Sequence, residues 1–362
     1  MKKIKVLHLI YRFDIGGLEK VLAESINNLN EGFEHTVVSL TEIAQYASEN
    51  LNYQIPLIAL NKKPGNDFSI YGRLYKLLKE IKPDVLHTYN LPTLEYQLIA
   101  FFAGVKIRIH AEHGRDISDP EGKNKKYNIL RRVINPFVKH WVTVSNDLYL
   151  WLQTTVKIAD HKNKLIYNGV DTEIFKPSNK VHNGFIIGTI GRFDPIKNQK
   201  ILIDTFLHIK NTEPELISHL KICIIGKGDE FENIQQLIKQ NDLENYFDLP
   251  GVKYDINEQL NNFDIFVLPS IAEGVPMTLL EAMSVGLPSI CSNVGGIPEV
   301  LPHNSGYLVA PENVQELSEK LIELMKDANK RKEMGQNARK QVIENFSIQA
   351  MVNQYKKLYS KL

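Results

Sequence analysis

The 362-residue chain has little cysteine and no long apolar run. Its two cysteines, Cys223 and Cys291, lie inside the apolar segments LKICIIG and GLPSICS, so we expect buried, reduced thiols rather than a disulfide. No run of 18 or more uncharged apolar residues exists, which argues against a transmembrane helix. The apolar start contains His8 and lacks a small-residue cleavage site, so it predicts a first strand rather than a secretion signal. We therefore expect a cytoplasmic protein.

The chain also lacks an excess of either charge. It has 43 Lys and Arg against 42 Asp and Glu, a net charge of +1, which does not indicate a nucleic-acid-binding protein. The segment DIGGLE, from Asp14 to Glu19, is not the Gly-x-Gly-x-x-Gly fingerprint of dinucleotide-binding proteins. The composition therefore gives no reason to expect a nucleic acid or a dinucleotide as partner.

What the sequence does have is alternation. Short apolar runs rich in valine and isoleucine alternate with longer segments of helical period, which is typical of parallel sheets covered by helices on both faces. The runs form two series, residues 3–10, 36–40, 84–88, 107–111 and 140–144, then residues 185–190, 220–225, 264–268 and 288–291. We predict two doubly wound α/β domains, residues 1–172 and 184–344, with a polar linker at 173–183 and a final helix within 345–362 that packs back on the first domain. Ligands of such domains bind beyond the carboxyl ends of the strands, so we expect the active site in a cleft that both domains face.

Two segments of the second half combine charge with turn and helix signals. The first, FIIGTIGRFDPIKNQKILIDTF, predicts a strand that ends at Gly191 and a helix that begins near Asn198, with Arg192 and Lys197 in the turn. Cations beside a helix N-terminus form an anion-binding site, because the backbone amides and the helix dipole add to their charge. Taken alone, this segment is equally well interpreted as carrying two solvated surface cations.

The second segment is LPSIAEGVPMTLLEAMSVGLPSICSNVGGIPEV, in which seven residues separate Glu273 from Glu281. Pro276 suits the first position of a helix, so Glu273 lies in the preceding loop and Glu281 lies about 7.5 Å along the helix. One ligand could then meet a carboxylate at each end and helix amides between them, in the order sugar, diphosphate, ribose. Two carboxylates at helical spacing usually mark a solvated face, but an unpaired charge at Glu281, inside MTLLEAMSV, would be costly.

Together these segments resemble glycosyltransferase family 4, the retaining enzymes of GT-B fold. The resemblance rests on GRFDPIKN and on EGVPMTLLEAMSVGLPSICSNVGGIPE, which contains the family's two glutamates at their spacing. It covers nearly the whole chain, because the amino half adds DIGGLE, AEHGRD, VSN and NGVD. AEHGRD, residues 111–116, is most similar to bacterial transferases of exopolysaccharide, capsule or O-antigen assembly. The resemblance implies an α/β GT-B architecture of two Rossmann-like doubly wound domains, with the acceptor side in the first and the nucleotide sugar in the second.

The resemblance also implies a role for each matching residue. Arg192 and Lys197 would hold the donor diphosphate, Glu273 the hydroxyls of the donor sugar and Glu281 the ribose. His113 would assist by hydrogen bonding near the transferred sugar, although a histidine satisfied within its own loop or core is the structural alternative. Main chain in the loop after the first strand and at the start of the second-half helix would complete the donor site, at Gly16, Gly17, Gly274, Val275, Pro276, Met277 and Thr278.

The expected reaction needs no metal and no cofactor. Asp-x-Asp, the carboxylate pair by which other nucleotide-sugar enzymes hold a divalent cation, occurs nowhere in the sequence. Arg192, Lys197 and helix amides would instead stabilise the charge that grows on the departing diphosphate. The resemblance implies that Glu273 binds hydroxyls and is not a covalent nucleophile, and that the sugar passes from a UDP-sugar, or less favourably a GDP-sugar, to a glycan or lipid-linked glycan.

Two other classes of function compete with this prediction. A non-catalytic partner subunit of another glycosyltransferase would keep the same architecture, but it would have no reason to keep Glu273, Glu281, Arg192 and Lys197 together. A sugar-nucleotide epimerase of the same fold would need no acceptor, and the family 4 signature of the second half disfavours it.

One segment predicts a membrane contact. Residues 123–141, KNKKYNILRRVINPFVKHW, contain six Lys and Arg and no carboxylate. Tyr127, Leu130, Ile134 and Phe137 recur at helical spacing, which is typical of a basic amphipathic helix on an anionic membrane. A helix whose apolar stripe faces its own sheet fits equally well, and both interpretations can hold for one helix.

Overall fold

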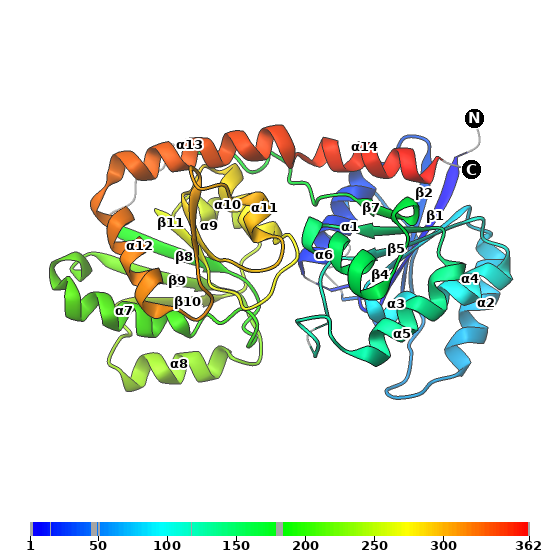
Figure 1. Ribbon diagram of the computed structural model, residues 1–362, viewed down its shortest axis with the longest axis horizontal. Helices are drawn as coiled ribbons and strands as arrows, with labels where there is room; N and C mark the ends of the chain where they lie inside the picture. The colour runs from blue at the N-terminus through cyan, green and yellow to red at the C-terminus, as the bar shows by residue number, and fades with distance from the viewer. Residues whose placement is uncertain are drawn as a thin grey trace. The chain divides into compact units, whose positions relative to one another are not determined.

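The computed structural model describes residues 3–14, 16–44, 49, 51–116, 118–178 and 184–360. The chain forms two compact units, one of residues 1–169 with 348–362 and the other of residues 170–347. Each unit is a parallel sheet covered by helices (Figure 1). The prediction of two doubly wound α/β domains is therefore confirmed. Residues 179–183 of the predicted linker lie outside the described residues.

In the amino-terminal unit, the described strands form one parallel sheet in the order β3-β2-β1-β4-β5-β6-β7. The strands are β1 (Ile4–Ile10), β2 (Phe33–Ser39), β3 (Leu57–Ala59), β4 (Val85–Tyr89), β5 (Ile107–Glu112), β6 (His140–Thr143) and β7 (Asn163–Leu165). The helices are α1 (Gly17–Asn28), α2 (Ser69–Ile81), α3 (Leu91–Leu94), α4 (Tyr96–Ala103), α5 (Lys125–Ile134), α6 (Asn146–Trp151) and α14 (Ile348–Tyr359). The unit also contains two short 3-10 helices, η2 (Asn135–Phe137) and η4 (Asp160–Lys162), and a π-helix, η3 (Leu152–Val156). Chain order reverses between the neighbouring strands β1 and β4, so the topological switch point of this sheet lies there.

In the carboxyl-terminal unit, the described strands are ordered β10-β9-β8-β11-β12-β13. They are β8 (Phe185–Ile190), β9 (Leu220–Ile225), β10 (Phe247–Gly251), β11 (Ile265–Leu268), β12 (Ser289–Ser292) and β13 (Gly306–Val309). The helices are α7 (Ile201–Thr212), α8 (Phe231–Gln240), α9 (Ile256–Leu260), α10 (Met277–Ser284), α11 (Ile297–Val300), α12 (Val314–Lys326) and α13 (Ala328–Asn345), with the turn η5 (Pro214–Ile217). Chain order reverses here between β8 and β11. The two charged segments singled out from the sequence follow these two strands.

The last helix belongs to the amino-terminal unit. The apolar stripe of α14 is buried there, at Ile348, Met351, Val352, Tyr355 and Leu358. The hydroxyl of Tyr359 forms a hydrogen bond of 2.7 Å with His87 Nδ1 on β4, and α14 also packs against α1. The helix is thus joined to the core of this unit by both apolar and polar contacts.

Both cysteines are buried and free, as the sequence predicts. Cys223 lies on β9 and Cys291 on β12, strands that other strands flank on both sides. Burial raises the pKa of the Cys223 thiol to about 12 and raises that of Cys291 as well, so both remain protonated near neutral pH.

Candidate active site

The loops after β8 and β11 meet at the switch point of the carboxyl-terminal sheet. The amide of Ile271 donates to the carbonyl of Ile196 at 2.7 Å, which joins the two loops. The helix after β8 begins at Ile201 and not near Asn198 as predicted, because Asn198 has a positive φ of 49° that interrupts the helical backbone. Parallel sheets of this topology bind ligands at such a point, so these loops form the first part of a candidate site.

An ion pair connects the two loops. Lys197 Nζ lies 2.5 Å from Glu273 Oε1, and the two side chains are 19% and 11% exposed. The Ser270 hydroxyl also donates to Glu273 Oε1, at 2.7 Å. Within the part of the chain that the structure describes, both hydrogen bonds to this carboxylate use Oε1. The sequence predicted both members of the ion pair, but it did not single out Ser270.

Glycine allows a third loop to approach Glu273. Gly295 has a φ of 54°, and a Cβ built on it would lie 1.9 Å from the carbonyl oxygen of Glu273. The next amide, of Gly296, donates to the carbonyl of Gly274 at 3.1 Å. Only glycine combines this backbone conformation with so close an approach. The Gly-Gly pair was visible in the sequence motif, but its contact with Glu273 requires the fold.

The segment GKGD packs against the turn that carries Arg192. Gly226 and Gly228 have φ values of 147° and 154°, and their Cβ positions fall on the carbonyls of Gly191 and Phe193. The amide of Phe193 donates to the carbonyl of Lys227 at 2.9 Å. Glycine is therefore required at both positions, because the two strand-end loops touch there. This contact explains the GKGD motif without a role in a nucleotide pocket.

The other charged residues of this half differ in their surroundings. The Arg192 side chain is 62% exposed and lies 3.3 Å from Asp194 Oδ2. Glu281 is 2% exposed on α10. Pro276 is the N-cap of α10 and not its first helical residue, because its ψ of 126° is extended, and no side chain caps the helix. The amides at the start of α10 therefore follow directly after the loop of Glu273.

In the amino-terminal unit, the predicted glycines lie at the start of α1. Gly16 is the N-cap, with a φ of −175° and no side-chain cap, and Gly17 is the first residue of the helix instead of a loop residue. A Cβ on Gly16 would meet the carboxylate of Glu19, a flexible side chain. The helix starts after β1, which is one of the two strands at the switch point.

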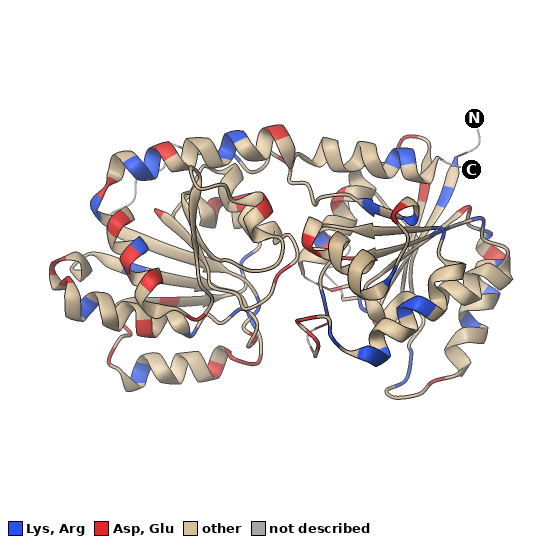
Figure 2. Ribbon diagram, viewed as in Figure 1, with Lys and Arg blue, Asp and Glu red and all other residues tan. Residues whose placement is uncertain are grey.

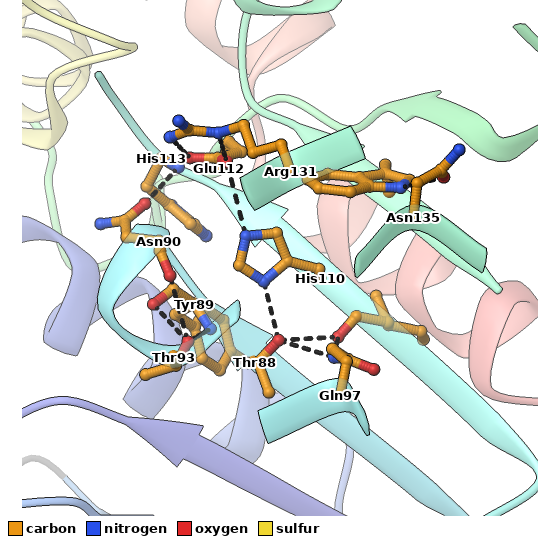
Figure 3. A network of polar contacts seen from close by, with 12 residues as sticks. Thr88, Tyr89, Asn90, Thr93, Gln97, His110, Glu112, His113, Arg131 and Asn135 are labelled. Atoms are coloured by element: carbon orange, nitrogen blue, oxygen red, sulfur yellow. Dashed lines mark hydrogen bonds and ion pairs between the residues drawn. The ribbon is translucent and has the colours of Figure 1, made fainter. Parts of the chain in front are cut away.

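His113 follows β5, the neighbour of β4 (Figure 3). Its ring lies 5.7 Å from the ring of Tyr89, centroid to centroid. Both ring nitrogens are buried and have no hydrogen-bond partner among the described residues. Burial lowers the pKa of His113 to about 4, so the ring is neutral near pH 7. The alternative of a histidine satisfied within the protein therefore does not apply to the ring.

Two family models match consecutive parts of the chain. The model described as glycosyltransferase family 4 matches residues 15–174, and the model described as glycosyl transferases group 1 matches residues 170–341. The chain belongs to glycosyltransferase family 4. It is therefore a glycosyltransferase, as the sequence motifs predicted.

The relatives of this glycosyltransferase include a capsular polysaccharide biosynthesis glycosyltransferase, CapH of Staphylococcus aureus, which is 28% identical over 82% of this chain and 83% of that protein. A UDP-Gal:alpha-D-GlcNAc-diphosphoundecaprenol alpha-1,3-galactosyltransferase of Escherichia coli is 27% identical, over 99% of this chain and 97% of that protein. An N-acetyl-alpha-D-glucosaminyl L-malate synthase of Bacillus anthracis is 28% identical, over 82% and 79%. The solved structure of Anabaena Alr3699/HepE in complex with UDP-glucose is 22% identical, with a TM-score of 0.87 over 99% of this chain and 100% of that one, and shows the same fold.

The basic segment of this glycosyltransferase differs from its predicted arrangement. Arg131 cannot face lipid, because its guanidinium is 2% exposed and bonded to Glu112. Arg132 donates to the carbonyls of Thr155 and Val156 at the end of η3. Among the described residues, no helix is long and apolar enough to cross a bilayer. The exposed residues of α5 instead include Lys125 and Lys126 together with Ile129 and Val133. Figure 2 shows in blue that α5 carries Lys and Arg.

Proposed function

We propose that this glycosyltransferase moves a hexose-type sugar from a UDP-sugar to a growing, lipid-linked cell-surface glycan, with retention of configuration at the anomeric carbon. The observation that carries the proposal is the Lys197–Glu273 ion pair at the switch point, directly before α10. It brings a cation, a carboxylate and helix amides to one place, and a nucleotide sugar has matching anionic and hydroxyl groups. The amino-terminal unit would carry the acceptor and the carboxyl-terminal unit the donor.

In this proposal Lys197, Arg192 and the first amides of α10 bind the donor diphosphate. The ammonium of Lys197 has three donors, of which one bonds Glu273. Arg192 is exposed and has a fork of donors suited to phosphate oxygens. As the bond from the anomeric carbon to the diphosphate breaks, its electron pair remains on the diphosphate, and preorganised cations stabilise that charge. This role needs neither a metal nor a cofactor.

Glu273 and Glu281 would bind hydroxyls at opposite ends of the donor. Both hydrogen bonds to the Glu273 carboxylate within the described residues use Oε1, which leaves Oε2 to accept a sugar hydroxyl. Glu281 is five residues after Pro276, about 7.5 Å along the helix axis, where it would accept the ribose hydroxyls. Main chain from Gly274 to Thr278 would lie along the diphosphate between them. The acceptor oxygen would attack the face that the diphosphate leaves and pass its proton to the departing diphosphate, so no residue is assigned as nucleophile.

His113 would serve the transferred sugar from the amino-terminal unit. A neutral imidazole has one donor and one acceptor, and both nitrogens of this ring are uncommitted among the described residues. A sugar hydroxyl would satisfy one of them. Gly16 and Gly17, at the uncapped start of α1, would let the backbone approach the donor phosphates.

The choice of donor and acceptor is supported by the relatives. The Escherichia coli enzyme is named for a UDP-sugar donor and a diphosphoundecaprenol acceptor, and the Anabaena structure holds UDP-glucose. A lipid-linked acceptor is presented at a membrane surface, so we propose that the enzyme works at the cytoplasmic face and contacts anionic lipid through the exposed face of α5.

The test is a screen of UDP-sugars and GDP-sugars for enzyme-dependent nucleotide release, with and without membrane lipid extract. The proposal predicts release with one UDP-sugar that rises when the lipid acceptor is added, and a product with the donor's anomeric configuration by NMR. Conversion of the donor to an epimer without any acceptor would contradict it. Failure of every nucleotide sugar to bind would favour a non-catalytic partner subunit instead.

A further inference from the structure

Asn90 uses its side chain in an unusual way. It is the N-cap residue of α3, a position where an asparagine oxygen normally accepts a hydrogen bond from an amide of its own helix. No such bond is present. Its Oδ1 instead accepts from the main-chain amide of His113 at 2.8 Å, across to the end of the neighbouring strand (Figure 3). Thr93 Oγ1 accepts from the amide of Tyr89, at 2.8 Å, in the same turn.

The backbone of Asn90 is strained to make this contact. Its φ of 58° and ψ of 168° lie in a region that is populated almost only by glycine. The amide of Asn90 donates to the carbonyl of Ala111 at 2.8 Å, which extends the hydrogen bonding of β4 and β5 past the end of β4. Strain of this kind persists only where surrounding contacts over-determine the conformation, and it gathers at functional sites.

A buried ion pair fixes the residue before His113. Arg131 Nε lies 2.7 Å from Glu112 Oε1, the carboxylate is 0% exposed, and the guanidinium stacks 4.8 Å from the ring of Trp151. His110 Nε2 is 3.5 Å from the same oxygen. Burial alone would raise the pKa of Glu112, but Arg131 and His110 reverse this and lower it to about 2. The hydrogen bonds of this carboxylate go to Arg131, and among the described residues it makes none to the ring of His113.

We infer that Asn90 and the Glu112–Arg131 ion pair are positioning residues, which hold the uncommitted ring of His113 in place for a hydroxyl of the transferred sugar. This inference rests on the proposed function, in which His113 is the residue of the amino-terminal unit that meets the transferred sugar. Asn90 fixes the His113 amide, and Glu112 fixes the preceding residue through α5. Tyr89, next to Asn90, supports the ring itself. Because neither ring nitrogen has a hydrogen-bond partner among the described residues, the orientation of the ring depends on its backbone and on packing.

The first test uses Asn90→Gly. Glycine adopts the observed backbone without strain but removes the bond to His113. We expect the melting temperature to stay close to that of the wild type and kcat to fall about 10- to 100-fold, since a misplacement near 1 Å can cost about 100-fold. The donor KM should change less than kcat, because the donor contacts assigned to Lys197 and Glu273 belong to the other unit and do not involve Asn90. Asn90→Asp keeps the acceptor oxygen and should restore most of kcat. Wild-type kcat in Asn90→Gly would overturn the role of Asn90.

The second test is a double-mutant cycle with His113→Ala. If Asn90 acts through His113, Asn90→Gly should lower kcat no further in the His113→Ala background. Independent losses that multiply would overturn the inference. Glu112→Gln combined with Arg131→Met removes both buried charges together and should behave as Asn90→Gly does. Arg108→Met is the matched control, since Arg108 lies at the other end of β5, where it donates to the carbonyls of Phe137 and Val105.

NMR separates failure of this inference from failure of the proposed function. The ring signals of His113, assigned by their loss in His113→Ala, should shift and broaden in Asn90→Gly even without substrate. If the ring signals shift in Asn90→Gly but His113→Ala keeps full activity, Asn90 positions the ring of His113 and His113 has no catalytic role. Unchanged ring signals in both Asn90→Gly and the Glu112/Arg131 double variant would overturn the positioning role itself.

Discussion

Lys197 and Glu273 form an ion pair between two strand-end loops of the carboxyl-terminal unit, 76 residues apart in sequence. The pair holds a cation beside the amino end of α10. We predict that Lys197→Ala lowers kcat about 100- to 1000-fold, as loss of one preorganised donor to a developing anion typically does. Arg192→Ala should lower kcat as well. Initial rates of nucleotide release, at saturating donor, give the measurement.

Lys200→Ala is the matched control for Lys197→Ala. Lys200 is an exposed lysine in the same turn, and it is the N-cap residue of α7 but makes no side-chain cap hydrogen bond. Its loss should leave kcat within about twofold of the wild type, because an exposed charge contributes little. Equal losses in Lys197→Ala and Lys200→Ala would mean that the turn acts through its overall charge and that the ion pair has no special role.

The strands that the sequence did not reveal all lie at sheet edges. The nine predicted apolar runs correspond to β1, β2, β4, β5, β6, β8, β9, β11 and β12. The missed strands β3, β7, β10 and β13 are the four outermost strands of the two sheets. An edge strand has one neighbour and partial exposure, so it needs no continuous apolar run, and β7 has the sequence NKL. Central strands are buried on both faces, so their sequences are continuous apolar runs, and these runs predicted them.

The residues of the candidate site likewise divide into those that the sequence predicted and those that only the fold reveals. Lys197, Glu273 and His113 were predicted because their neighbours in sequence form motifs. Asn90 and Gly295 were not, because each acts on a residue more than 20 positions away, His113 and Glu273 respectively. Contacts between residues so far apart form only because the order of the strands brings their loops together, and the sequence motifs do not show that order. The sequence also placed Arg131 among cations facing lipid, since a charge count does not show that Glu112 lies beneath it.

Gly295→Ala should damage the donor site. Its φ is positive, and the new Cβ would lie 1.9 Å from the Glu273 carbonyl, so the loop of Glu273 must move. We expect the Kd for UDP-sugar to rise more than about 10-fold, measured by calorimetry, since donor contacts depend on sub-ångström placement. Gly72→Ala, where a Cβ meets nothing within 4 Å, should leave the Kd unchanged. Wild-type affinity in Gly295→Ala would show that this loop is not part of the donor site.

Sugar transfer should persist in EDTA. Lys197, Arg192 and the amides of α10 supply the positive potential that the departing diphosphate requires, and the sequence has no Asp-x-Asp pair. The rate in excess chelator should match the rate in magnesium within about twofold. Complete loss in chelator that magnesium reverses would contradict this prediction and would call for a search for carboxylate ligands.

Acid should destabilise the amino-terminal unit through a chain of neutral histidines. His35 Nε2 donates to the Leu29 carbonyl, so His35 Nδ1 accepts from His8 Nε2 at 3.0 Å, and His8 Nδ1 accepts from the Tyr89 hydroxyl at 2.8 Å. Burial lowers the pKa of His8, His35 and His87. The unfolded chain therefore binds more protons below its ordinary histidine pKa near 6.5. Stability should be full above that pH and fall as the pH drops, by up to about 1.4 kcal/mol per pH unit for each histidine.

Urea unfolding between pH 7.5 and 5 measures this loss. His35→Gln keeps one acceptor and one donor, so it should fold and reduce the slope of unfolding free energy against pH by about one proton. His161→Gln, on the surface, is the matched control. A slope that is the same in His35→Gln as in wild type would show that this histidine does not contribute to the pH dependence.

The exposed face of α5 should bind anionic membranes. Ile129 and Val133 are 53% and 59% exposed, and Lys125 and Lys126 lie on the same face by helical spacing. Two lysines near an anionic surface contribute about 2 kcal/mol, about 30-fold in partitioning, and the aliphatic side chains add apolar burial. Lys125→Gln with Lys126→Gln should therefore reduce sedimentation with anionic liposomes about 30-fold at low salt and leave donor binding unchanged.

Ile129→Ser with Val133→Ser separates the apolar contribution from the electrostatic one. This variant should bind more weakly at every salt concentration, whereas added salt should weaken the wild type and leave the lysine variant almost unaffected, because screening acts on the charges. Arg131 and Arg132 are left unchanged, since both bond within the protein. Lys332→Gln with Lys340→Gln on α13 removes two other exposed lysines as a control. Equal binding by all variants, at low and high salt alike, would show that α5 is not the membrane contact.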